Sequence, residues 1–242
     1  MSDSGLVDAV LVALTAEGID APSLALAWAR VAPVVAIVPA FGLRALPAPA
    51  RMAMGGLFAL AIAPAVHARA GHGPWFVELL VEAARGVPLA ISTAVPLWAA
   101  TSVGGAIDAL RGAQEGTGLA VVDGKPTPLG ALFAMLASLA FLASGGPSRV
   151  ALAAASASGD LGAPLARAAD ALTSGIVIAV AIAAPIVAAS LVIEVALALL
   201  GRAATPTNVQ ALTALGRGTA ILGVLAVLFE RVSAAVAALS SR

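Results

Sequence analysis

The sequence contains no cysteine, no tyrosine and only two histidines. Without cysteine, the chain can form no disulfide, thiolate metal site or cysteine nucleophile. Charged residues make up 11% of the chain, whereas soluble domains carry about 25%. The net charge is zero, so the sequence offers no basic surface to attract nucleic acid.

Catalytic and cofactor motifs are also missing. No G-x-S-x-G element is present, and no histidine follows His72 that could act as a base. Gly124 and Lys125 are followed by Pro126, which does not fit a phosphate-binding loop. A metal site needs three or four ligands, and His67 and His72 lie in a Gly/Pro loop with no further histidine. We therefore expect no enzyme activity, no metal and no cofactor.

The rest of the sequence is mainly apolar. They make up 61% of the chain, and the mean hydropathy is +1.03. Long runs rich in alanine and leucine favour helices over the alternating pattern of a membrane barrel. Residues 1–23 carry four acids and no Lys or Arg, which is the wrong charge for a signal peptide. The predicted fold is an all-α polytopic membrane protein.

About six hydrophobic helices, many of them broken by proline or glycine, are expected within a single domain of residues 1–242. A short N-terminal segment of residues 1–23 precedes them, and a central polar, glycine-rich loop is expected at residues 104–127. So many breaks indicate that most of these helices face other protein. The six runs are 24–41, 52–66, 76–103, 128–144, 171–200 and 209–239, and residues 145–170 are expected to form a connection.

The central loop interrupts the apolar sequence with charges and glycines, and glycine allows backbone conformations that other residues resist. We expect it to lie at the working centre of a membrane conduit. Asp108 and Arg111 are three residues apart and are predicted to pair if the helix extends that far. The candidate residues for the loop are Asp108, Arg111, Gly112, Gln114, Glu115, Gly116 and Gly118.

Four of the charges within the apolar runs are further candidates, because charged side chains there usually pair or line a pathway. Glu82 and Arg85 share a helix face and are interpreted mainly as a structural pair, the alternative being the wall of a conduit. Arg30 could pair with a carboxylate of another subunit or extend to the membrane surface. Glu194 is expected to serve helix packing or pairing, because a proton relay would need several such groups.

The order of these landmarks resembles the FliR/SctT family, the export-gate subunits of flagellar and virulence type III secretion systems. The acid followed by glycine four residues later is Glu82 and Gly86, and a G-x-x-I-D-x-x-R-G element runs from Gly104 to Gly112. The latter element favours the injectisome branch. The remaining matches are Arg30, Pro33, Pro39, Pro47 and Arg51, then Asp123 and Pro126, then Pro128 to Gly145-Gly146, and near the C-terminus Arg202, Asn208 and Val209.

The resemblance implies a pore subunit of the bacterial inner membrane that exports unfolded proteins and has no chemistry of its own. It implies partners of the FliP/SctR, FliQ/SctS and FlhB/SctU types, and a loop after the middle helix that helps plug the closed pore. The alternative is a small-molecule permease in which Glu82, Arg85 and Glu194 line the path. No convincing internal repeat supports that alternative.

Overall fold

The structure is a computed structural model. It describes residues 9, 12, 14–16, 19–41, 47–67, 74–110, 127–157 and 162–203, and in the C-terminal part 216, 218–224, 226, 227, 230 and 234. Within these residues the chain is helical and contains no strand, which confirms the predicted all-α class.

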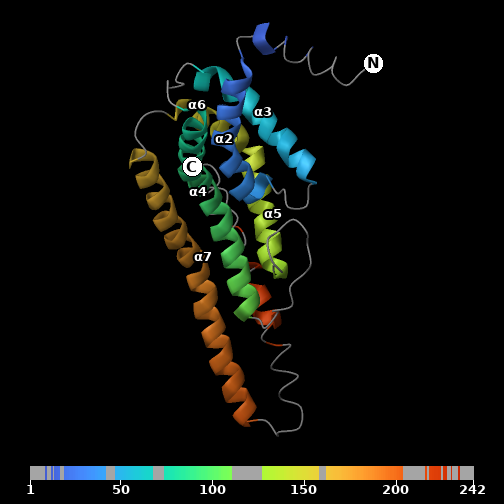
Figure 1. Ribbon diagram of the computed structural model, residues 1–242. Coiled ribbons are helices and arrows are strands. Elements are labelled where there is room, and N and C mark those ends of the chain that lie inside the picture. The colour runs from blue at the N-terminus through green and yellow to red at the C-terminus, as the bar shows by residue number, and fades with distance from the viewer. Residues whose placement is uncertain are drawn as a thin grey trace. The chain divides into compact units, whose positions relative to one another are not determined.

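Six α-helices and one short 3-10 helix have defined bounds in the described ranges. Figure 1 shows α4 and α7 as long continuous helices, of 36 and 42 residues. The elements are α2 (Ala21–Ile37), η1 (Pro39–Phe41), α3 (Ala48–His67), α4 (Trp75–Leu110), α5 (Pro128–Ala143), α6 (Gly146–Ser156) and α7 (Gly162–Ala203).

Proline breaks fewer helices than the sequence suggested. Several prolines lie in the first turn of a helix, where the missing N–H has no helical partner to lose; Pro22, Pro128 and Pro147 are examples. Pro33 and Pro185 lie inside helices that continue past them. The expectation of generally broken helices is therefore wrong for α4 and α7.

Two of the expected boundaries are also wrong. Helix α4 continues to Leu110, so the first residues of the predicted central loop, 104–110, are helical. The predicted connection 145–170 contains α6 and the start of α7. Between α5 and α6 the chain turns at Ser144 and Gly145, and Gly145 has a left-handed φ of 75° that glycine adopts without a steric cost.

Three of the described helices are long and apolar enough to cross a membrane, namely α3, α4 and α7. The pair α5 and α6 passes the same test when it is counted as one broken span, which gives up to four. These helices confirm the predicted polytopic membrane architecture.

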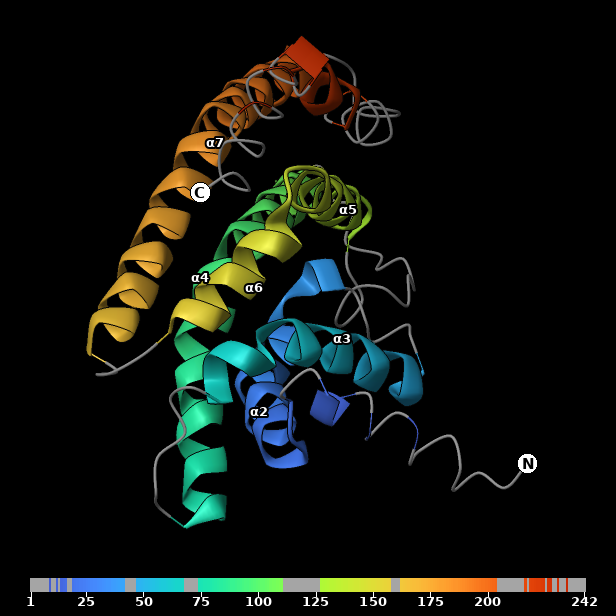
Figure 2. The ribbon, with the colours of Figure 1, turned by 90° about the horizontal axis from the view of Figure 1, so that it is seen from above.

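The chain forms two compact units. The first unit comprises residues 1–94 and 145–172, and the second comprises 95–144 and 173–242. In the first unit, α3 packs beside α2 and also contacts α6 (Figures 1 and 2). The buried core of these three helices consists of Leu26, Ala27, Val31, Ala59, Ile62, Ala63, Val66 and Ala154.

Glycines lie at close helix contacts in each unit, as small residues do in membrane helix packing. In the first unit, a Cβ added at Gly86 of α4 would lie 2.0 Å from the carbonyl oxygen of Arg30 in α2. In the second unit, a Cβ at Gly104 of α4 would lie 2.4 Å from the carbonyl oxygen of Leu129 in α5. Both neighbours are backbone atoms, which cannot rotate away as a side chain can.

Replacing Gly86 with alanine should therefore destabilise the protein. The added methyl would push α2 and α4 apart, and overpacking of this kind costs about 1–3 kcal/mol. We expect a lower thermal unfolding midpoint in detergent. The matched control is G56A, in a helix where an added Cβ meets no atom within 4 Å, so its midpoint should stay equal or rise. Equal midpoints for the two variants would contradict the tight crossing.

Candidate functional site

A buried cluster of charges joins three helices of the first unit. The Nε of Arg30 in α2 donates to Oε2 of Glu82 in α4 at 2.5 Å, and the Nη2 of Arg30 forms an ion pair with the same oxygen. Arg85, one turn along α4, donates from Nη1 to Oε1 of Glu82 at 2.5 Å. Each oxygen of the Glu82 carboxylate therefore has an arginine partner.

Arg30 also reaches the third helix. Its Nη1 donates to the carbonyl oxygen of Ala154 at 2.8 Å. Ala154 lies in the last turn of α6, where carbonyl groups lack a helical N–H partner and the helix dipole favours a positive charge. The guanidinium thus satisfies a helix end and a carboxylate together, which the fork of donors on an arginine makes possible.

This arrangement corrects both interpretations of Arg30. Its side chain is 1% exposed, so it does not extend to the membrane surface. Its carboxylate partner is Glu82 of the same chain, so no acid of another subunit is needed. The expected contact of Glu82 with Arg85 is present, and Arg30 enlarges it to a group of three. A conduit-wall role for Glu82 and Arg85 stays a prediction.

Glycine and acid act together at this crossing. Gly86 lies one turn after Glu82, and its lack of a side chain lets α4 approach the backbone of Arg30. The close approach brings the Glu82 carboxylate within reach of the Arg30 guanidinium. The sequence showed this four-residue spacing only as a family resemblance, and the contact between the two helices explains it.

A second buried acid occupies the second unit. Asp108, near the end of α4, is completely buried. Its Oδ2 accepts from the backbone N–H of Leu129 at 2.6 Å and of Gly130 at 3.4 Å, both in the first turn of α5. These amides have no helical partner, and the positive end of the helix dipole favours a carboxylate there. Asp108 therefore caps α5 from another helix.

The sequence did not identify this cap. The pairing of Asp108 with Arg111 stays a prediction, and the contacts described for the Asp108 carboxylate are to backbone amides. Arg111 lies outside the described residues. An exchange of the two charges would remove the acceptor that Leu129 and Gly130 use. The spacing of Gly104 and Asp108 was the available signal, since Gly104 permits the close contact with α5 one turn earlier.

Only two of the other predicted site residues lie in the described part of the chain. Gly112, Gln114, Glu115, Gly116 and Gly118 lie outside the described residues, as does Asn208. Glu194 and Arg202 lie in α7, Glu194 half-buried and Arg202 exposed. Within the described ranges, no group of three acidic or histidine side chains could hold a metal ion.

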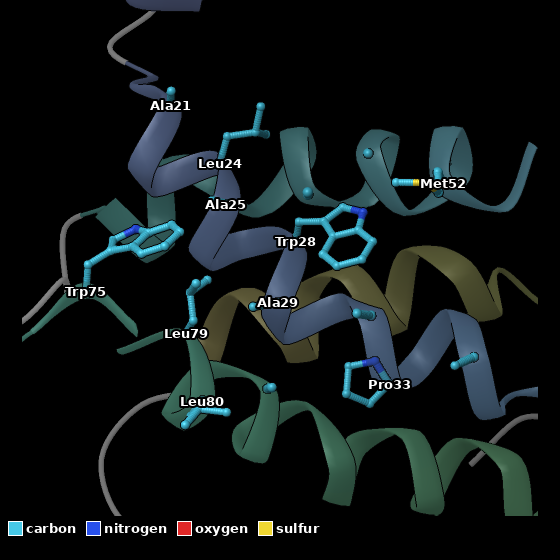
Figure 3. A pocket seen from close by; sticks show the side chains of 15 residues that line it. Ala21, Leu24, Ala25, Trp28, Ala29, Pro33, Met52, Trp75, Leu79 and Leu80 are labelled. Atoms are coloured by element: carbon cyan, nitrogen blue, oxygen red, sulfur yellow. The ribbon is translucent and has the colours of Figure 1, made fainter. Parts of the chain in front are cut away.

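An apolar groove of about 920 Å³ crosses the surface of the first unit. Figure 3 shows side chains of three helices around it, with Trp28 from α2, Met52 from α3, and Trp75 and Leu79 from α4. Alanines of α2 and Gly56 and Ala59 of α3 complete its apolar lining. Ordered water in a cavity needs polar partners. A groove with this apolar lining therefore suits apolar groups.

Removing the Glu82 carboxylate should damage the protein far more than removing Arg85. The E82A variant leaves the buried Arg30 without its countercharge, which costs about 3–5 kcal/mol for a buried pair. The R85A variant keeps the Arg30–Glu82 pair and removes a side chain that is 24% exposed, so we expect a loss of up to about 1 kcal/mol. Unfolding midpoints in detergent measure both. Similar losses for the two variants would show that Arg30 does not depend on Glu82.

Comparison with known proteins places the chain in a family. A search of curated proteins gives no match. The family model described as bacterial export proteins, family 1, matches residues 21–242, from the first residue of α2 to the end of the chain. The resemblance to the FliR/SctT family is thereby confirmed, and the injectisome branch stays a prediction. The chain therefore belongs to bacterial export proteins, family 1, the FliR/SctT family, and is a multi-pass inner-membrane component of a type III export apparatus.

Proposed function

We propose that this chain is a pore-forming structural subunit of the export gate, and that the segment between α4 and α5 helps plug the closed channel for unfolded proteins. Asp108 anchors the segment from the end of α4, and the plug residues proposed are Arg111, Gly112, Gln114, Glu115, Gly116 and Gly118. The chain contributes walls and a closure to the pore, and no chemical step.

The contact between α4 and α5 carries this proposal. Asp108 accepts from the amides of Leu129 and Gly130, and the backbones of Gly104 and Leu129 lie close together. The described residues before and after the segment 111–126 are therefore held together. A segment anchored at both ends can occupy a channel without being carried away by the exported protein. Its glycines and charges differ from the apolar helices on both sides.

Helix lengths support an assembly with other subunits. At 1.5 Å per residue, α7 is about 63 Å long, whereas the apolar core of a bilayer is about 30 Å thick. Large apolar side chains remain exposed along it, among them Ile176, Val192 and Leu199. Lipid alone cannot cover this length. We propose that small gate subunits of the FliP/SctR and FliQ/SctS types, and the FlhB/SctU-type switch protein, cover the remainder.

The permease alternative has less support. A substrate path needs polar groups that face the substrate. Glu82 is buried, and both its oxygens already accept from arginines. Such a group stabilises the contact between α2, α4 and α6 and offers little to a passing solute.

Deleting residues 112–122 should make the assembled gate leak. Without the plug, small molecules should cross a closed pore, because the five residues of the segment 111–126 that remain are too few to fill it. Uptake of a small dye into vesicles that contain the purified complex measures the leak. The matched control is the double variant A113S/T117S, which keeps the length of the segment and all the proposed plug residues and should stay sealed. A deleted complex that assembles and remains as tight as the unmodified one would contradict the plug.

A further inference from the structure

The first turn of α5 takes its cap from an unusual place. Leu129 and Gly130 are the second and third residues of the helix, and their amides are those that an N-cap side chain ordinarily binds. Here both amides donate to Asp108 of α4. The residue in the N-cap position, Thr127, makes no side-chain cap bond.

Thr127 is nevertheless placed to act as a cap. Its backbone has the extended conformation of an N-cap residue, with φ −67° and ψ 156°. Its Oγ1 is buried and has no hydrogen-bond partner among the described residues. The oxygen lies 2.8 Å from the position that a Cβ of Gly130 would take, beside the turn whose amides it could serve. A buried hydroxyl without a partner is unfavourable and calls for an explanation.

We propose that α5 has two mutually exclusive caps, Asp108 in the present state and Thr127 in a second state in which the end of α4 has moved away. When Asp108 withdraws, the Thr127 hydroxyl accepts from the same amides. The first turn of α5 then keeps a cap in both states. The spare cap offsets part of the cost of separating the two helices, so Asp108 and Thr127 together form a latch.

The glycines at the crossing fit such a latch. Gly104 and Gly130 bring the two backbones together without side chains of their own between them. When α4 and α5 separate there, no side chain of Gly104 or Gly130 has to be pulled out of the neighbouring helix. The latch deepens the proposed function and rests on it, because Asp108 and Thr127 lie on either side of the segment 111–126 in the sequence.

A cycle of variants tests the two caps. T127V removes the hydroxyl and T127S keeps it, each alone and combined with D108A. The readout is hydrogen exchange of the first turn of α5 in the assembled complex. We expect T127V alone to leave exchange unchanged, because Asp108 holds the amides. In the D108A background, T127V should speed exchange about five-fold, the effect of losing one N-cap, and T127S should not. An equal effect of T127V in both backgrounds would overturn the proposal.

A disulfide lock tests whether the latch opens during export. The chain has no cysteine of its own, and a Cβ added at Gly105 would lie 3.8 Å from Oγ1 of Thr127. The pair G105C/T127C should therefore form a disulfide between the end of α4 and the start of α5. Oxidation after assembly should reduce export at least ten-fold, and a reductant should restore it. The single variants G105C and T127C are the controls.

Different results would contradict the plug and the latch. A locked complex that exports at the normal rate would overturn the latch, whereas a leak after deletion of residues 112–122 would still support the plug. If the deletion leaves the pore tight, the plug is wrong, and the exchange cycle still decides whether Thr127 replaces Asp108 as the cap.

Discussion

Close backbone contact at a glycine, with a buried acid one turn away, is the constraint on which the packing of α4 depends. In the first unit, the acid is Glu82 and the glycine is Gly86. In the second unit, the glycine is Gly104 and the acid is Asp108. In both places the glycine removes the side chain that would hold the helices apart. The acid then binds a group of the neighbouring helix that would otherwise lack a partner.

Such contacts give specificity that apolar surfaces lack. Alanine and leucine faces pack in many registers with similar free energy, but a buried carboxylate is tolerated only where its partner lies within hydrogen-bond distance. A shift of α2 by one turn would leave Glu82 without Arg30, and a shift of α5 would leave Asp108 without its amides. The charges are few, and they select one arrangement. The Asp108 contact also holds the end of α4 to the start of α5.

The class of fold and the main helices could be predicted from composition and apolar runs, because a chain this apolar must pair its backbone internally. The ends of the helices could not be predicted in this way. Proline and glycine suggested breaks in several helices, yet α4 runs without a break from Trp75 to Leu110. Packing of α4 against α2 and α5 offsets the loss of a helical hydrogen bond at a proline, and a local pattern does not show that packing. The helical residues 104–110 were assigned to a loop for the same reason, since their glycines serve a helix crossing.

The sequence by itself determined the membrane setting, the helical class, the family and the absence of cysteine, since each follows from composition or from the order of motifs along the chain. Only the tertiary structure decided what the charges do. It pairs Arg30 with Glu82 across 52 positions of sequence and directs the Nη1 of Arg30 to α6. It also assigns Asp108 to the amides of α5, which Thr127 could have capped locally. Hydrogen bonds depend on the positions of atoms from separate helices, and spacing within one helix does not give those positions.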